Sequence, residues 1–466
     1  MDKLRKKDFT WLEGTAFALA AVAVQLTSET TAQWGTYFYS PADTGRRTIY
    51  VSIGIVWLIF VAGRLLDGIT DPLIGIWSDR FRTEPGRLRF PRIRGRRRPL
   101  VFWGSILMAF TMVAMWFPPI HGESWANFFY ALFIVSLHWV FWTLCVIPLN
   151  ALMPEIARSA EARVKLGIWY SVGMVVGLAA VEVIVPMLLS ALDPSRAAGA
   201  DVFSPVGYQR TSIILAAVSV VLFQFFVWAV KERHTSDGAA QRVPALRDML
   251  AALKNKACLI FLAAFFLHAI GILAVQKALP YWTELGLQGD ESTVAKCMIP
   301  YILMTLVSYA FVPWLARRFS VKWLMFSGMA LYAFGLPITY AIAVLPVTPE
   351  TKLAFAFALF GLIGIAQGFI FVLIVPMLGE IIDLDERDTG RRREAVYGGL
   401  HGVATKIGQA CSILVATQLM HIFGNSTGRP LGAFLVGPVG GVFVVLGMVV
   451  LCFYPVVKAP EAPKSS

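Results

Sequence analysis

The stretch GRLLDGITDPLIGIWSDR, residues 63–80, contains two aspartates four residues apart, Asp67 and Asp71. If this stretch is helical, both carboxylates project from one face of the helix. The preceding residues 51–63 carry no charge, and a carboxylate in such an apolar segment costs about 2.5–3.5 kcal/mol on membrane-insertion scales. Two like charges one turn apart also repel, and a bound cation or a proton removes that conflict. The pair therefore predicts a cation- or proton-binding site.

The residues beside the pair indicate which ion it would take. Thr70, on the adjoining edge of the same helix, adds a hydroxyl oxygen, and no histidine or cysteine accompanies it. Three or four hard oxygen ligands suit Na⁺ or a smaller alkali ion better than a transition metal. Arg64 offers the alternative of a structural ion pair, but one arginine does not neutralise two carboxylates. We therefore predict Na⁺ or H⁺ at Asp67 and Asp71, with Arg64 as a charge partner and no other cofactor.

Other polar residues in apolar segments are candidates for the same cavity. Lys406, in VATKIGQA, lies too far from the ends of its segment to reach water easily. We expect it to approach the aspartates and compete with the cation; contacts with backbone carbonyls are the alternative. Gln25 and Glu29 are candidates to line the cavity. Trp142 and Tyr170 are candidates for solute contact, although most aromatic side chains in membrane proteins only pack or lie at the interface.

The composition places these residues in a membrane protein. The 466 residues are 57% hydrophobic and only 15% charged, with a mean hydropathy of +0.66. A soluble protein carries about 25% charged residues. A scan for apolar runs of about twenty residues predicts twelve transmembrane helices. They cover residues 14–39, 49–78, 99–119, 126–153, 165–191, 208–231, 256–285, 295–316, 321–345, 352–378, 395–424 and 431–455.

Lysine and arginine are distributed unequally over the predicted loops. Loop 79–98 carries nine arginines, and residues 3–7 and 231–247, on the same side, are also basic. Loops 117–125 and 346–351, on the opposite side, contain neither lysine nor arginine. By the positive-inside rule, both termini are predicted to be cytoplasmic, in a cell or inner membrane. The same rule explains the net charge of +12, so we expect no nucleic-acid partner.

The order of the segments predicts two similar halves. Six predicted helices precede a long polar segment and six follow it, which is typical of a duplicated transporter. We predict an N-terminal six-helix bundle with the cation site at residues 1–230, a cytoplasmic linker at 231–255 and a C-terminal six-helix bundle at 256–466. The sequence contains no Ser/His/Asp arrangement, phosphate loop or metal cluster. We therefore predict that it is not an enzyme.

Longer motifs resemble one family. They are RLLDGITDPLIGIWSDR, the downstream GRRRP, IPLNALMPEIA and, most specifically, DLDERDTGRRREAVYGGLHGVATKIGQ. These motifs are similar to those of the glycoside–pentoside–hexuronide:cation symporters of the major facilitator superfamily, and the likeness runs through all twelve predicted helices. The resemblance implies an all-α membrane protein whose twelve transmembrane helices form two pseudo-symmetric six-helix bundles, the major facilitator fold.

The resemblance also implies which residues form the cation site. The family's two cation-binding aspartates fall on Asp67 and Asp71, and the polar residue before the second, asparagine in melibiose-type members, is Thr70 here. The family's threonine ligand on the fourth helix falls on Thr143, and its lysine on the eleventh helix falls on Lys406. The other residue types of the family's cation site are thus present. Thr70 in place of the family's asparagine leaves open whether the coupling ion is Na⁺ or H⁺.

The sugar site of the family is altered. Where melibiose-type members carry charged or aromatic sugar contacts, this chain has Gln25, Val146, Asn150 and Ser171. A site built for a hydroxyl-rich ligand loses much affinity when its paired donors and acceptors are absent, so the resemblance implies a solute other than melibiose. The candidate solute contacts are Gln25, Glu29, Trp142, Val146, Asn150, Tyr170 and Ser171. At the cytoplasmic gate we expect Asp79 to contact nearby arginines, Arg80 and Arg96.

The expected function is cation-coupled symport, by alternating access, of a small organic solute such as a glycoside or another sugar derivative. We expect a monomer in the lipid bilayer. Two alternatives stay open. The solute is an amphiphile such as a lysolipid, which the loss of the sugar contacts favours, or the chain is a sensor that does not transport.

Overall fold

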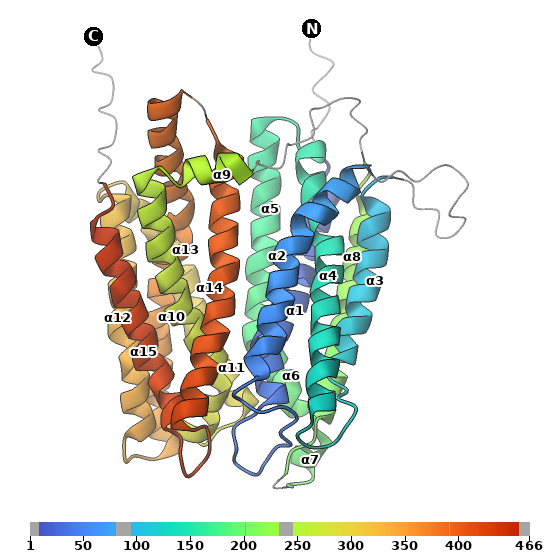
Figure 1. Cartoon of the computed structure of the whole chain (residues 1–466), viewed down its shortest axis with the longest axis vertical. Coiled ribbons are helices and arrows are strands. Elements are labelled where there is room, and N and C mark those ends of the chain that lie inside the picture. Colours follow the sequence, from blue (N-terminus) through green and yellow to red (C-terminus); the bar gives the residue numbers. More distant parts are fainter. Residues whose placement is uncertain (1–8, 81–94, 201, 233–245, 391, 456–466) are drawn as a thin grey trace. The chain divides into compact units, whose positions relative to one another are not determined.

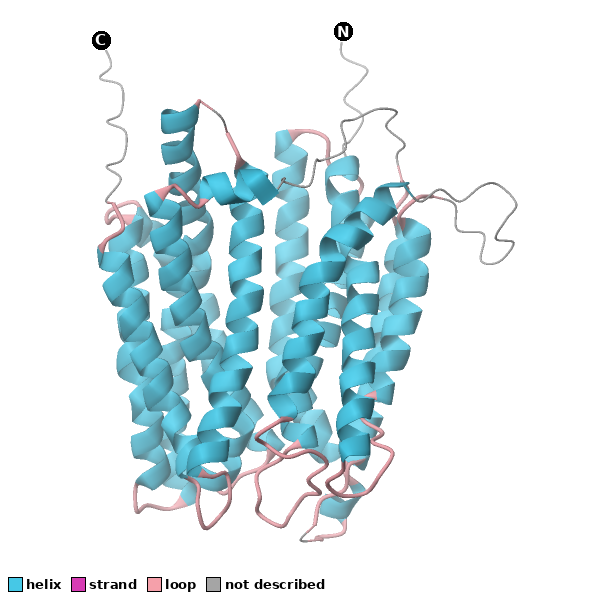
Figure 2. Ribbon diagram, in the orientation of Figure 1, coloured by secondary structure: helices cyan, strands magenta, loops and turns pink. Residues whose placement is uncertain are grey.

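The structure is a computed structural model that describes residues 9–80, 95–200, 202–232, 246–390 and 392–455. In these ranges the chain is almost entirely helical and contains no strand (Figure 2). It divides into two compact units. Unit 1 comprises Met1–Arg242 with Asp290–Ala295, and unit 2 comprises Val243–Gly289 with Lys296–Ser466.

The helices are labelled in Figure 1. Unit 1 contains α1 (Trp11–Tyr39), α2 (Val56–Arg80), α3 (Arg98–Ala114), α4 (Trp125–Ile156), α5 (Ala160–Ala179), a π-helix (Ala180–Ile184), α6 (Val185–Ala191), α7 (Pro194–Ala197) and α8 (Val206–Ala229). Unit 2 contains α9 (Leu246–Ala252), α10 (Lys256–Gly286), most of α11 (Glu291–Ala316), α12 (Val321–Val344), α13 (Pro349–Thr389), α14 (Glu394–Phe423) and α15 (Leu431–Cys452). Most of the predicted linker 231–255 lies outside the described residues, and α9 occupies its last part.

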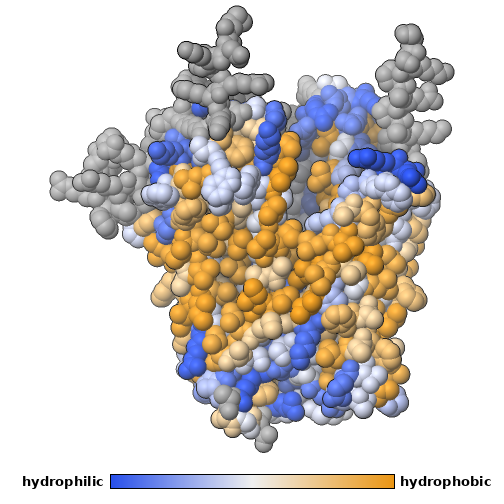
Figure 3. Space-filling view, turned by 180° about the vertical axis from the view of Figure 1, so that it is seen from behind, coloured by the Kyte–Doolittle hydropathy of each residue, from blue (hydrophilic) through white to orange (hydrophobic). Residues whose placement is uncertain are grey.

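Each predicted membrane segment coincides with a helix or, for 165–191, with the continuous run of α5, the π-helix and α6. Within the described ranges, eight helical spans are long and apolar enough to cross a membrane. In Figure 3 the apolar side chains gather over the middle of the helices, and hydrophilic ones lie toward their ends. The prediction of an all-α membrane protein is confirmed. That all twelve segments cross the bilayer stays a prediction.

Glycines set the closest helix contacts inside unit 1. A Cβ atom at Gly63 of α2 would lie 2.6 Å from Cδ1 of Trp139 on α4, so only glycine lets the two helices pack this way. A Cβ atom at Gly173 of α5 would lie 2.0 Å from the carbonyl oxygen of Ala18 on α1. Helix α2 is thereby fixed on α4, and α5 on α1.

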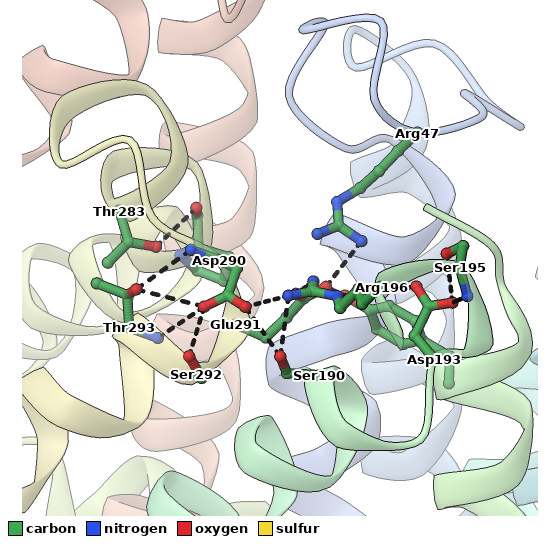
Figure 4. A network of polar contacts seen from close by, with 12 residues as sticks. Arg47, Ser190, Asp193, Ser195, Arg196, Thr283, Asp290, Glu291, Ser292 and Thr293 are labelled. Atoms are coloured by element: carbon green, nitrogen blue, oxygen red, sulfur yellow. Dashed lines mark hydrogen bonds and ion pairs between the residues drawn. The ribbon is translucent and has the colours of Figure 1, made fainter. Parts of the chain in front are cut away.

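The segment Asp290–Ala295 belongs to unit 1, although the chain on both sides of it belongs to unit 2. Arg196, in α7, forms ion pairs with both Asp290 and Glu291 (Figure 4). Arg47 also pairs with Glu291, with 2.8 Å between Nη1 and Oε1. The hydroxyl of Tyr208 on α8 donates to the same carboxylate at 2.8 Å. We call Arg47, Arg196, Asp290 and Glu291 the Arg196 cluster.

The carboxylate of Glu291 is the most deeply buried member of the Arg196 cluster, with a side chain only 1% exposed. Two arginines share it, and removing one partner from a buried ion pair leaves the opposite charge poorly compensated. Asp290 differs, because hydrogen bonds surround it. Burial alone would raise the pKa of Asp290, but a hydrogen bond from Ser292 and the charge of Arg196 outweigh it and hold the pKa below its ordinary value.

Glu291→Gln should lower the melting temperature of the detergent-solubilised protein by several degrees. The substitution keeps the size of the side chain but removes the charge that Arg47 and Arg196 share, and breaking a buried ion pair costs about 3–5 kcal/mol. The matched control is Glu123→Gln, at an exposed loop carboxylate, which should change the melting temperature little. Equal melting temperatures for the two variants would contradict this role of Glu291.

The stabilising effect of Asp290 should persist in mild acid. Because its pKa is lowered in the folded protein, its contribution is complete above the ordinary value of about 3.9 and is lost only as the pH falls through the lower folded value. The difference in melting temperature between the unmodified protein and Asp290→Asn should therefore be constant from about pH 7 to pH 5 and shrink only below about pH 4. A difference that fades between pH 7 and pH 5 would show that the pKa is not lowered.

Candidate functional site

Asp67 lies at the centre of the candidate cation site and is fully buried, at 0% exposed. The hydroxyl of Thr143 on α4 donates to its Oδ1 at 2.6 Å. On the other side, Nη1 of Arg64 lies 4.0 Å from its Oδ2. The structure thus brings together Asp67, Arg64 and Thr143 from two helices, including the threonine that only the family resemblance had indicated.

Arg64 is held in place by an aromatic ring. Its guanidinium carbon lies 3.7 Å from the centroid of the Trp139 ring, in a cation–π contact. Both side chains are buried, and Gly63 allows α2 to approach Trp139 closely enough for this contact. The charge of Arg64 is therefore fixed beside Asp67.

The carboxylates around Arg64 outnumber it. Glu29 on α1, Asp67 and Asp71 all interact electrostatically with this one guanidinium. Three ionised carboxylates and one arginine leave a formal excess of two negative charges in an apolar surrounding. Such an excess is unstable unless a cation or protons neutralise it. This is the property that a coupling-ion site requires.

The other two predicted cation ligands are placed differently. Asp71 is half-buried on α2. The hydroxyl of Thr70 donates to the backbone carbonyl of Asp67 at 3.3 Å, so it is engaged within its own helix. Across the described ranges, no three histidine, cysteine, aspartate or glutamate residues form a group that could hold a metal ion. The oxygen of Thr70 keeps lone pairs with which it can bind a cation, so the prediction of Thr70 as a ligand beside Asp67, Asp71 and Thr143 stays open.

Four of the predicted solute contacts lie on partly open helix surfaces. Gln25 is half-buried on α1 beside Gly177 of α5. Tyr170 on α5 and Asn150 on α4 are joined by a hydrogen bond between their side chains, and Ser171 is exposed. Together with Glu29, these residues offer amide, hydroxyl and carboxylate groups from three helices.

The remaining two predicted solute contacts lie on α4. Trp142 is half-buried, and its ring meets that of Trp139 edge-on with 5.6 Å between centroids. Its indole N–H has no hydrogen-bond partner among the described residues and is available to a ligand. Val146, by contrast, is 3% exposed and packs in the hydrophobic core of unit 1 with Cys145 and Leu149. In this structure Val146 therefore acts through packing.

The basic motif GRRRP forms an anchor inside unit 1. The backbone N–H groups of Arg96, Arg97 and Arg98 donate to the carboxylate of Glu232 at 2.6–2.7 Å, which places an anion at the N-terminus of α3. The side chains of Arg96 and Arg97 both donate to Glu155 on α4 at 2.6 Å. Arg96 is thus bound to Glu155, whereas we had expected it near Asp79. The side chains of Asp79 and Arg80 lie outside the described residues.

Lys406 lies half-buried on α14, in unit 2, so its predicted approach to the aspartates of unit 1 stays a prediction. Two roles were missed in the sequence. Glu155 was visible within the motif IPLNALMPEIA, but nothing in its spacing indicated the arginines it would bind. Trp139 had the spacing of an ordinary packing residue, and only the fold shows it against Arg64.

Comparison with known proteins identifies the family. The family model described as MFS/sugar transport protein matches residues 16–458. The chain belongs to this family. Membership places it among the glycoside–pentoside–hexuronide:cation symporters, confirms the expected class of membrane transporter, and excludes an enzyme.

The relatives are distant but cover most of the chain. The isoprimeverose transporter of Lactiplantibacillus pentosus is 22% identical over 411 residues, which span 87% of this chain and 79% of that protein. The uncharacterized symporter sll1374 of Synechocystis sp. is also 22% identical, over 86% of this chain and 87% of its own. The raffinose carrier protein of Pediococcus pentosaceus is 20% identical over 83% of this chain and 58% of its own length.

Solved structures confirm the fold. A mutant of the nucleoside transporter NupG matches 95% of this chain and 99% of its own with a TM-score of 0.65 at 12% identity. A bacterial homolog of the human lysosomal transporter Spinster, described as inward-facing and unoccupied, matches 96% of both chains with a TM-score of 0.62 at 13% identity. At these identities the likeness concerns the fold alone, and it agrees with the predicted major facilitator fold.

Thr143→Val should weaken cation binding while leaving the protein folded. Valine has nearly the shape of threonine but lacks the hydroxyl that binds Asp67 at 2.6 Å. Because a hydrogen bond to a charged group contributes about 1.5–3 kcal/mol, the cation concentration that gives half-maximal uptake should rise about 10- to 100-fold. Uptake into proteoliposomes at graded Na⁺ concentration or pH measures this change.

The control for this measurement is Thr15→Val, on α1, where the hydroxyl only donates to the backbone carbonyl of Trp11. This variant should retain the original cation dependence. If Thr143→Val also retains it, the hydrogen bond to Asp67 has no part in cation binding.

Proposed function

We propose that this protein is a symporter that couples the uptake of a glycoside or another sugar derivative to Na⁺ or H⁺ by alternating access. The observation that carries the proposal is the excess of carboxylates around one buried arginine, Arg64. The family and the isoprimeverose and raffinose carriers among the relatives support a sugar as the class of solute. A solute with many hydroxyl groups also suits the amide, hydroxyl and indole groups of Gln25, Asn150 and Trp142.

The coupling ion would bind between α2 and α4. Its ligands would be the carboxylates of Asp67 and Asp71 and the hydroxyl oxygens of Thr70 and Thr143, while Arg64 offsets part of the negative charge. With the ion in place the formal excess around Arg64 would fall from two negative charges to one, and a less charged site crosses the apolar barrier region at a lower cost. Coupling then arises because the ion and the solute both bind more tightly to one conformation than to the other.

Further features belong to this proposal. The basic loops would orient both termini toward the cytoplasm. In the proposed mechanism Lys406 of α14 would compete with the cation for the aspartates. The protein would function as a monomer.

A thermal-shift screen of the purified protein tests the function directly. Isoprimeverose, raffinose and lactose are added with and without Na⁺, at neutral and at acid pH. Because a ligand that binds the native state raises its melting temperature, a sugar should produce a larger rise when the coupling ion is present. A rise with lysolipids and none with any sugar would support an amphiphile carrier, and proteoliposomes that take up neither class with any cation would support a sensor.

Asp71→Asn should abolish cation-dependent uptake of the sugar found in this screen. The substitution keeps the shape of the side chain but removes one of the negative charges around Arg64 and one of the proposed carboxylate ligands of the cation. Uptake in proteoliposomes with and without an imposed ion gradient is the measurement. Asp43→Asn, in an exposed loop, is the matched control. Gradient-driven uptake by Asp71→Asn equal to that of the control would remove Asp71 from the coupling mechanism.

A further inference from the structure

A second buried carboxylate lies in unit 1, apart from the residues around Arg64. Glu182, in the π-helix that follows α5, is 2% exposed. The side-chain amide of Gln33 on α1, itself 0% exposed, donates to its Oε2 at 3.0 Å. An ionisable group inside a membrane span is costly, and it marks a functional site more often than a packing contact. Neither residue belongs to the cation site or to the predicted solute contacts.

The backbone around Glu182 departs from the α-helix. The N–H of Val185 donates to the carbonyl of Ala180, five residues earlier. Pro186 has no N–H group, so it cannot donate to the carbonyl of Glu182 as the residue four positions on would in an α-helix. Such π-helical turns occur frequently at functional sites. The sequence therefore widens the helix at the residue that carries the buried carboxylate.

Gln33 continues a polar line along α1. It follows Gln25 and Glu29 at intervals of four residues, so the three side chains share one face of the helix. Glu29 interacts electrostatically with Arg64, and Gln25 is a predicted solute contact. The line thus leads from the cation site along α1 to Glu182.

Several buried polar atoms of α1 near Gln33 lack hydrogen-bond partners among the described residues. They are the hydroxyl of Thr30, the indole N–H of Trp34 and the side-chain oxygen of Gln33 itself. All three side chains are at most 2% exposed. They lie within about one turn of each other on α1, since an α-helix has about 3.6 residues per turn. Buried polar groups without partners are rare in folded proteins. These groups include both donors and acceptors, as a hydroxyl-bearing ligand requires.

We propose that Glu182 and Gln33, with Thr30 and Trp34, form a polar subsite that binds hydroxyl groups of the transported solute. Each hydroxyl can donate to the Glu182 carboxylate or to the Gln33 oxygen and accept from the indole of Trp34. The subsite binds no cation of its own, because it has one carboxylate and Gln33 already donates to it. This assignment rests on the proposed function and extends it, because it gives the sugar specificity-determining contacts with α1 and with the π-helix that follows α5.

The first test uses the sugar identified by the thermal-shift screen, together with its monodeoxy analogues. Glu182→Gln and Gln33→Leu should each raise the KM for uptake about 10- to 100-fold, the range set by hydrogen bonds to a charged group, while the cation dependence stays unchanged. One deoxy analogue should bind more weakly than the parent sugar to the unmodified protein. To Glu182→Gln, the analogue and the parent sugar should bind almost equally, because the missing hydroxyl is the one that Glu182 binds. The control is Glu161→Gln, an exposed carboxylate on α5 whose partner is Lys165. An unchanged KM in both subsite variants would overturn the assignment and leave the proposed function intact.

The second test does not depend on finding a sugar. Glu182→Cys and Gln33→Cys are made in a chain whose accessible cysteines, Cys411 and Cys452, are replaced by serine. A small hydrophilic methanethiosulfonate reagent should label both positions during transport, and the sugar should slow the labelling. If no sugar is transported, the proposed function fails; labelling at both positions then still supports a water-filled polar subsite. Folded variants that stay unlabelled under all conditions would show that the pair is structural and overturn the assignment.

Discussion

The hydrogen bond between Thr143 and Asp67 is the contact on which the rest of the site depends. It joins α2 to α4 at a residue that is completely withdrawn from solvent. In an apolar surrounding, an ionised carboxylate needs several partners, and those of Asp67 include one hydroxyl at 2.6 Å and one guanidinium at 4.0 Å. With Asp71 and Glu29 acting on the same arginine, the local charge stays negative. This negative charge is the reason we propose that a coupling ion binds here.

Two other clusters of charged residues join parts of unit 1, so that the carboxylates around Arg64 are held at a fixed place. At one end, Glu232 accepts three backbone N–H groups at the start of α3, and Glu155 of α4 binds two arginines of the same motif. In another part of the unit, the Arg196 cluster holds Asp290–Ala295 (Figure 4). In both places each carboxylate meets more than one donor. Arginines and carboxylates thus contact each other directly in both places, whereas three carboxylates act on the one arginine Arg64.

The sequence predicted the helices well because each apolar run is long and bounded by polar loops, and local hydropathy suffices to find such runs. It also indicated Asp67 and Asp71 as candidates, since an i, i+4 pair of acids in an apolar segment is conspicuous without any tertiary information. Trp139, Glu155 and Glu232 could not be assigned in this way, because their roles come from helices that are distant in sequence. Thr70 shows another limit. Its hydroxyl donates to the backbone carbonyl of Asp67, which spacing does not reveal, and its oxygen keeps lone pairs with which it can bind a cation.

The polar line on α1 explains how one helix could interact with both the coupling ion and the solute. Glu29 interacts electrostatically with Arg64, and in the proposed mechanism it would respond when a cation neutralises the aspartates of α2. Gln25 and Gln33 lie one turn before and one turn after Glu29 on the same face, and Gln33 is tied to Glu182 of the π-helix. A change of charge at the cation site would alter the position or protonation of Glu29 and, through the rigid helix, the two amides beside it. Coupling in this protein would then need no long pathway, because one face of a single helix touches both ligands.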